Sequence, residues 1–286
     1  MRILVTGIGI LSPLGPTAAA TMDALLAGER GFRPVSLFDT AGFRSDIAGE
    51  IAGIDVAAVA PKGAAESWSR TDVMAVTAAK EALAHARLTS ADCDLVLGGT
   101  TAGMYETEDL LAQMHRDPEA RRPLEKMLSH PLSSTIDHLR HALGGFAKAR
   151  TVCSACSSGA NAMIMAATWL LLGRSQRVLA GGADGLCRLT YSGFSCLSAM
   201  SSVACRPFDA ERDGLTLGEA GAFLVLETDA SAAARGVEPI AELSGWAAGA
   251  EGHHITNPEA SGATAARTMT AALARADLSP ADIDYV

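Results

Sequence analysis

One segment constrains this chain more than any other: a short strand-forming run that passes through two cysteines into an almost uncharged helix. The residue pattern predicts a strand over residues 149–152 and a helix over residues 160–172, in which only Asn161 and Thr168 are polar. A helix with almost no polar face is expected inside a protein. It is shorter than the roughly 20 residues that cross a bilayer, so we expect a buried helix in a globular core.

Cys156 lies just before this helix and is the chemical signal of the segment. The unpaired N–H groups and the dipole of a helix N-terminus favour a thiolate, and the same N–H groups can hydrogen-bond an oxyanion. We therefore predict that Cys156 is a nucleophile, with an unreactive core cysteine as the competing interpretation. Cys153 and Cys156 also form a C-x-x-C, but neither the flanking residues nor a second such pair supports a redox or zinc role.

Four segments carry a resemblance to a known family. Residues 151–160, TVCSACSSGA, resemble the active-site cysteine signature of the β-ketoacyl-acyl carrier protein synthases, the condensing enzymes of fatty-acid and polyketide synthesis. Residues 205–222, CRPFDAERDGLTLGEAGA, resemble the segment that follows the cysteine in that family, in the expected order and spacing. Residues 2–15 and 253–258 also fit. The resemblance therefore covers essentially the whole chain.

The resemblance implies a thiolase-like α/β fold, in which two similar halves pack face to face in α-β-α-β-α layers. We expect residues 1–235 to form the first half and residues 236–286 to begin a second half that is incomplete in this chain. By the same resemblance, Cys156 accepts an acyl group from an acyl carrier protein. Malonyl-carrier protein is then decarboxylated, and the resulting carbanion attacks the acyl-enzyme.

In the family, two histidines and a lysine come from a stretch just after the point at which this chain ends. His253 and His254 precede that stretch, so we do not give them the role of the family's histidines. Two expectations stay open. Either the parent protein continues past Val286, or this chain by itself neither decarboxylates malonyl thioesters nor folds well, because half of the fold would leave an apolar face uncovered.

Further residues of the matching segments and their neighbourhood receive expected roles. We expect four residues to lie near the substrate channel, with a purely structural placement as the alternative: Met104, Phe194, His253 and His254. Five others are expected to brace the second motif, where opposite charges can pair across a glycine-rich turn: Arg206, Asp209, Arg212, Asp213 and Glu219.

The rest of the chain alternates between helix and strand patterns, which is typical of an α/β architecture. Residues 2–6 predict a first strand and Gly7-Ile-Gly9 a turn, but Ser12 stands where a dinucleotide-binding fingerprint needs glycine. A charged stretch at residues 106–143 predicts an exposed helical excursion. Other helices are expected over residues 17–28, 69–86 and 264–276, and other strands over residues 95–99, 177–184, 222–227, within 237–249 and from 282.

A net charge of −9 gives the chain no basic footprint for nucleic acid and no polybasic membrane anchor. An acidic carrier protein would need a local basic patch. Arg116, Arg121, Arg122 and Lys126 are candidates for such a patch, with ordinary solvated charge as the competing interpretation. The six dispersed cysteines are typical of thiols in a reducing compartment, so we expect a cytoplasmic protein.

We expect no metal and no resident cofactor. His138 and His141 can share a helix face, but no acidic or cysteine partner is patterned around them. In the resembling family, phosphopantetheine arrives on the acyl carrier protein.

The family also implies a homodimer, in which the strand before Cys156 pairs across a two-fold axis, or else a heterodimer with a related subunit. Two other functions compete with a synthase. They are a thiolase, which the second motif disfavours, and a non-catalytic chain-length-type partner subunit, which usually lacks the cysteine found here.

Overall fold

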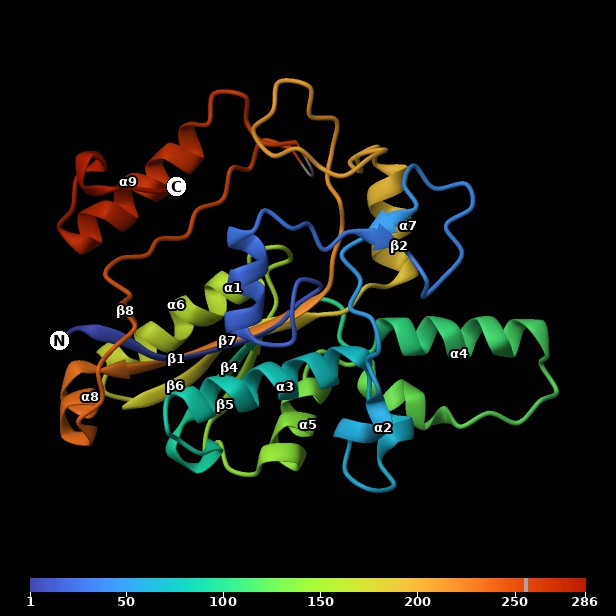
Figure 1. The fold of residues 1–286 in the computed structure, drawn as a ribbon, viewed down its shortest axis with the longest axis horizontal. Coiled ribbons are helices and arrows are strands. Elements are labelled where there is room, and N and C mark those ends of the chain that lie inside the picture. The colour runs from blue at the N-terminus through green and yellow to red at the C-terminus, as the bar shows by residue number, and fades with distance from the viewer. Residues whose placement is uncertain (255–256) are drawn as a thin grey trace.

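The computed structural model describes residues 1–254 and 257–286, and a mixed six-stranded sheet in the order β5-β4-β6-β7-β1-β8 forms its centre (Figure 1). Strand β4 runs parallel to β5 and β6, whereas β7 is antiparallel to its neighbours β6 and β1. The strands of this sheet are β1 (Ile3–Leu11), β4 (Asp94–Gly98), β5 (Ala149–Val152), β6 (Arg177–Asp184), β7 (Ala220–Thr228) and β8 (Ala241–Glu242).

Helices cover both faces of the sheet, which gives three layers (Figure 1). Helices α3 and α5 pack on one face, and α6 packs on the other. A separate two-stranded ribbon joins β2 (Arg33–Pro34) and β3 (Ile47–Ala48). The helices are α1 (Ala18–Leu26), α2 (Val56–Val59), α3 (Arg70–His85), α4 (Met104–Arg116), α5 (Ser134–Leu143), α6 (Ser158–Leu171), α7 (Arg188–Cys196), α8 (Asp229–Arg235) and α9 (Ala263–Ala276).

Strand β4 shows why the sheet lies inside the protein. All five of its residues are buried, with Leu95 and Leu97 in the core under α3 and Val96 in the core under α6. Apolar residues on both faces are what a central strand of a helix-covered sheet requires. No helix of residues 1–254 or 257–286 has the length and apolarity needed to span a bilayer.

The glycines near the N-terminus do not make the predicted turn. Strand β1 continues through Gly7 and Gly9 to Leu11, with a register irregularity between Val5 and Gly7. A Cβ on Gly9 would lie only 2.1 Å from the carbonyl oxygen of Ala78 in α3. Glycine is therefore needed here because α3 crosses the strand at very short range, and not because the chain reverses.

Helix α6 is buried on one side only, so the expectation of an entirely buried helix is wrong for this chain. Ala162, Ala166 and Leu170 are inaccessible to solvent against the sheet, whereas Thr168 and Leu171 are exposed. Three-layer packing explains the difference, because the sheet covers only the side of the helix that faces it.

The C-terminal part forms less strand than the residue pattern predicts. Residues 237–249 contain only the two-residue strand β8, and residues 282–286 form no strand, with Tyr285 92% exposed. A strand requires a neighbour that completes its hydrogen bonds. In the described part of the chain, β1 offers such an edge to Ala241 and Glu242, and no strand lies beside residues 282–286.

A buried carboxyl group joins the starts of α3 and α4. Glu106 accepts a hydrogen bond from the backbone N–H of Arg70 at 2.8 Å through Oε1, while Oε2 is buried without a protein partner. Burial raises the pKa of Glu106 to about 7; the Arg70 N–H opposes this shift, and nearby Asp72 adds to it. The folded protein therefore favours the neutral carboxyl group more strongly than the unfolded chain does.

Replacing Glu106 with glutamine should make stability less dependent on pH. Because the pKa of Glu106 is raised in the folded protein, its carboxyl group loses the proton at lower pH in the unfolded chain than in the folded one. Ionisation of Glu106 therefore lowers the free energy of unfolding as pH rises from about 4.5 to about 7. We expect Glu106→Gln to be more stable than the parent by about 3 kcal/mol above that window, measured by urea unfolding at several pH values. An equal pH dependence in both proteins would contradict this account.

Gly9→Ala should destabilise the fold by about 2–3 kcal/mol, because the added Cβ cannot fit beneath α3. The matched control is Gly193→Ala in α7, where an added Cβ meets nothing within 4 Å. Thermal or urea unfolding measures both, and the control should change the free energy of unfolding by less than about 1 kcal/mol. Similar stabilities for the two variants would show that the strand and α3 adjust freely.

Candidate active site at the start of helix α6

Cys156 lies on a short turn between the end of β5 and the first residue of α6. Both Cys153 and Cys156 are exposed. The turn is closed by hydrogen bonds from the N–H of Ser157 to the Ser154 carbonyl at 3.3 Å and from the N–H of Ser158 to the Ala155 carbonyl at 3.1 Å. The thiol predicted from the sequence is therefore accessible at the N-terminal end of a 14-residue helix.

The backbone of this turn is strained. Ala155, directly before Cys156, has a φ of 52°, in the left-handed region that residues with a Cβ usually avoid. Ser158 holds the turn from within, because its hydroxyl donates to the Ala155 carbonyl at 2.6 Å and accepts from the Ser154 N–H at 2.9 Å. The direction in which Cys156 leaves the backbone thus depends on a locally supported, unusual conformation.

Asp184, at the end of β6, positions the loop that follows β4. Its Oδ1 accepts hydrogen bonds from the N–H groups of Thr100 and Thr101, each at 2.7 Å, and from the Thr101 hydroxyl at 2.9 Å. On the other side, the Thr71 hydroxyl donates to the Ala102 carbonyl at 2.6 Å. Asp184 was not among the site residues predicted from the sequence. An acidic residue at the carboxyl end of a buried strand was the signal available.

The four predicted channel residues lie in different parts of the structure. Met104 begins α4 and is partly buried, and Phe194 in α7 packs against a small core with Tyr191. His253 and His254 are exposed before α9, and the Asn257 N–H donates to His254 Nδ1 at 3.0 Å. Residues 255 and 256 of the matching segment 253–258 lie outside the described residues. The channel role of all four stays a prediction.

The charged residues of the second motif do not pair with one another in the way their spacing suggested. Arg206 donates to the carbonyl of Glu211, and Arg212 donates to the carbonyl of Asp209 at 2.8 Å. Asp213 turns to a neighbouring segment instead, where hydrogen bonds led by the Ser201 hydroxyl lower the pKa of its carboxyl group. The two arginines bond backbone carbonyls and not the carboxylates of the motif, because in so tight a turn the carbonyls lie within reach of the arginine side chains.

Glu219 joins segments that are distant in sequence from the second motif. Its buried carboxylate accepts from the N–H of Ile51 at 2.9 Å and from the N–H of Leu186 at 3.1 Å, and it forms an ion pair with Arg70. These three partners come from separate segments of the chain. The carboxylate therefore joins the loop after β3, the start of α3 and the segment after β6.

His138, which was considered as a metal ligand, makes contacts with other side chains of the core. His138 stacks on Trp68 with ring centroids 4.8 Å apart, and its Nδ1 lies 2.9 Å from Asp72. Within residues 1–254 and 257–286, no three His, Cys, Asp or Glu side chains group in a way that could hold a metal ion.

Two of the four residues of the predicted basic patch contact residues of α4. Arg122 donates to the Gln113 carbonyl at 3.3 Å, and Lys126 lies 3.6 Å from Asp109. Arg116 and Arg121 are exposed.

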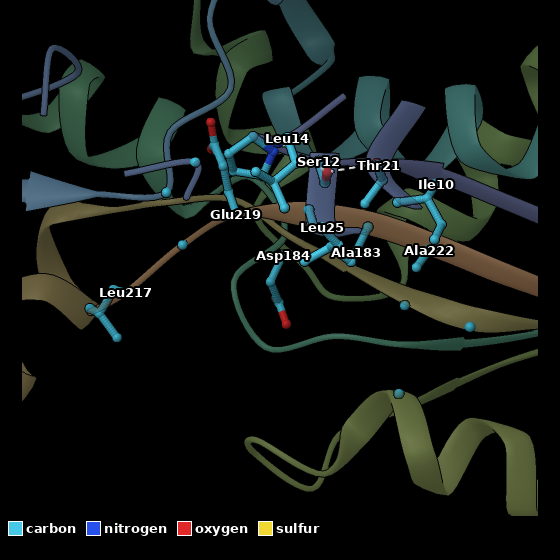
Figure 2. Close-up of a pocket in the computed structure, with 18 of the residues that line it drawn as sticks. Ile10, Ser12, Leu14, Thr21, Leu25, Ala183, Asp184, Leu217, Glu219 and Ala222 are labelled. Carbon is cyan, nitrogen blue, oxygen red and sulfur yellow. Dashed lines mark hydrogen bonds between the residues drawn. The ribbon is translucent and has the colours of Figure 1, made fainter. Parts of the chain in front are cut away.

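An apolar groove of about 940 Å³ lies beside the cysteine turn, over β1, β6 and β7. Figure 2 shows Ile10 of β1, Leu25 of α1 and Ala222 of β7 around it. Gly159 and Met163 bring the first turns of α6 into the lining, but Cys156 is not part of it. The groove therefore adjoins the candidate nucleophile without containing it.

Comparisons with known proteins agree on one family. The sequence profile described as "Beta-ketoacyl synthase, N-terminal domain" matches residues 1–232, and that described as "Beta-ketoacyl synthase, C-terminal domain" matches residues 240–286. The chain is 30% identical over 298 residues to 3-oxoacyl-(acyl-carrier-protein) synthase 2 of Staphylococcus aureus, a match that covers 100% of this chain and 72% of that protein.

Solved structures have the same fold. The ishigamide ketosynthase/chain length factor matches with a TM-score of 0.89 and 30% identity, covering 99% of this chain and 72% of that chain. AntDE:AntF, a type II PKS acyl-carrier protein in complex with its ketosynthase bound to the hexaketide, matches with a TM-score of 0.84 and 25% identity, again over 99% and 72%.

Asp184→Ala should loosen the loop at Thr100 and Thr101, because two backbone N–H groups lose their acceptor. We expect a loss of about 1–3 kcal/mol in the free energy of unfolding and faster amide hydrogen exchange at these two residues. Asp184→Asn, which keeps an oxygen at the same place, is the matched control and should preserve most of the protection. Unchanged exchange in the alanine variant would refute the positioning role.

Proposed function

The chain belongs to the β-ketoacyl synthase family, and from this premise we propose that it carries out the condensing reaction of fatty-acid or polyketide synthesis with Cys156 as the acyl acceptor. Its fold is the thiolase-like α/β fold of that family. The observation that carries the assignment of the nucleophile is the exposed thiol of Cys156 on the turn that opens α6.

The first step is acyl transfer. The Cys156 thiolate attacks the carbonyl carbon of an acyl thioester carried by phosphopantetheine on an acyl carrier protein. The tetrahedral oxyanion that forms accepts a hydrogen bond from the backbone N–H of Cys156, next to the start of α6, where the helix dipole adds positive potential. The carbon–sulfur bond to phosphopantetheine then breaks, the released thiol takes up a proton, and the acyl group remains on Cys156.

The second step forms the carbon–carbon bond. Loss of carbon dioxide from malonyl-carrier protein leaves a carbanion, which attacks the acyl carbon bound to Cys156 and expels the thiolate. We assign no part of this decarboxylation to His253 or His254, which are exposed on the segment before α9. The reaction needs no resident cofactor, because the nucleophile is a side chain and the thioesters arrive on carrier protein.

We propose an acyl carrier protein and a second synthase-like subunit as the partners. A solved relative is a ketosynthase in complex with its acyl-carrier protein, and another relative is named a ketosynthase/chain length factor, which supports both kinds of partner. Strand β5 ends the sheet, so its outer edge offers backbone groups to a strand of another subunit. Pairing of β5 with a second copy or with a related chain would build the dimer next to the cysteine turn.

Two further assignments complete the proposal. Residues 1–235 form the cysteine-bearing half, which is supported by the end of α8 at Arg235, and residues 236–286 begin the other half.

All six cysteines are free thiols, which supports a location in the reducing cytoplasm.

Cys156→Ala should abolish acyl loading. The protein is incubated with an acyl-acyl carrier protein, and the adduct is located by intact-mass and peptide mass spectrometry. The matched control is Cys153→Ala, which removes the other exposed thiol of the same turn and should keep the adduct. An acyl adduct that persists in Cys156→Ala, or that disappears in the control alone, would rule out Cys156 as the acceptor.

A further inference from the structure

Two of the serines that flank Cys156, Ser154 and Ser157, are bound by a single side chain from α6. The side-chain amide nitrogen of Asn161 lies 2.7 Å from the Ser154 hydroxyl oxygen and 3.2 Å from that of Ser157. The two serines also contact each other, because the Ser157 hydroxyl lies 3.1 Å from the Ser154 hydroxyl and 2.9 Å from the Ser154 carbonyl oxygen. Asn161 thus links both flanks of the cysteine turn to a regular helix.

These contacts surround the one residue of the turn that is held in an unfavourable conformation. A left-handed backbone costs a residue with a Cβ roughly 1–2 kcal/mol, and Ala155 adopts it at a φ of 52°. Such a conformation persists only where neighbouring contacts determine it. Ser154 lies directly before Ala155 and Ser157 two residues after it, so the Asn161 contacts restrain the chain on both sides.

We propose that Asn161 is a positioning residue for Cys156: its amide, through Ser154 and Ser157, holds Ala155 in the left-handed conformation and so orients the Cys156 thiol and backbone for attack on the acyl thioester. This inference rests on the proposed function of Cys156. Asn161 is neutral, so it acts through geometry and leaves the charge around the thiol unchanged. Acyl transfer is sensitive to such orientation because a small misplacement of reacting atoms lowers the rate steeply.

Thr168 provides a matched control on the same helix. It is a polar, exposed residue of α6, and its hydroxyl donates only to the Ile164 carbonyl one turn earlier, at 2.8 Å, among the contacts described. Thr168→Ala therefore removes a side-chain hydrogen bond from α6 without touching the cysteine turn. Asn161→Ala removes the two Asn161 contacts to the turn and leaves those of Ser158 in place.

The test measures the rate of acyl transfer from acyl-acyl carrier protein to Cys156 in a single turnover, at several donor concentrations. We expect Asn161→Ala to lower the rate at saturating donor by about 10-fold to 100-fold, with little change in the donor concentration that gives half the maximal rate. Thr168→Ala should stay within about 2-fold of the parent. An unchanged saturating rate in Asn161→Ala, or a change confined to the half-saturating concentration, would overturn the positioning role.

A second substitution separates positioning from a general loss of structure. Glycine adopts the left-handed conformation at no steric cost, so Ala155→Gly combined with Asn161→Ala should recover part of the lost rate. A double variant as slow as Asn161→Ala would show that Ala155 is not what Asn161 supports. If circular dichroism shows that Asn161→Ala does not fold, Ser154→Ala is used instead, because it removes the shorter of the two Asn161 contacts. We expect it to lower the acyl-transfer rate at saturating donor by the same factor.

The outcomes distinguish this inference from the proposed function. Absence of any adduct on the parent protein, or an adduct that survives in Cys156→Ala, would remove the function itself. An adduct on Cys156 that forms at the parental rate in both Asn161→Ala and Ser154→Ala would leave the function in place and refute only the role of Asn161.

Discussion

The close approach of helix α6 to the sheet is the constraint on which the site depends. A Cβ on Gly98, the last residue of β4, would lie 2.4 Å from the backbone carbonyl carbon of Ser158, the first residue of α6. Only a residue without a side chain allows the helix to begin so near the strand. Because Gly98 is in register with Val152, the cysteine turn lies at the carboxyl edge of two parallel strands. That edge is where open α/β sheets commonly carry their binding and catalytic groups.

Two carboxylates hold the segments around this edge, Asp184, which is partly buried, and Glu219, which is buried. Asp184 binds the loop after β4, and Glu219 joins three separate segments. At the opposite edge of the sheet, where β6 begins, Glu227 accepts from Thr6 at 2.6 Å and from Ser231 at 2.8 Å. A buried carboxylate is costly unless donors satisfy it, and each of these has several. The carboxylates that support this edge therefore come from the end of β6 and from the residue just before β7, which are distant in sequence from Cys156.

The chemistry proposed for Cys156 combines a rigid support with a strained turn. The sheet and α6 fix where the turn begins and ends, while the left-handed Ala155 decides where the thiol points. Local strain of this kind needs support from its surroundings. Here the support is short-range and polar, and it comes from serines and an asparagine within five residues of the cysteine.

Short-range signals were enough for part of this structure. The sequence by itself determined β5 and β6, whose bounds the structure confirms, because runs of strand-forming residues end there in Cys, Ser, Gly or Asp. It predicted a helix over residues 69–86, which the structure shows as α3 with Ser69 as its N-cap, and it identified the family through the segments around Cys156 and residues 205–222. These features depend on residues close together in the chain.

Only the tertiary structure decided the features that need a distant partner. Gly9 makes a close contact and not a turn, because α3 crosses β1 there. Residues 282–286 form no strand, because no neighbouring strand is present beside them in the described chain. Asp184 binds Thr100 across 84 positions of sequence, which no local pattern reveals. The physical reason is common to all three: backbone conformation is suggested by neighbouring residues, but packing and hydrogen-bond partners are supplied by segments that only the fold brings together.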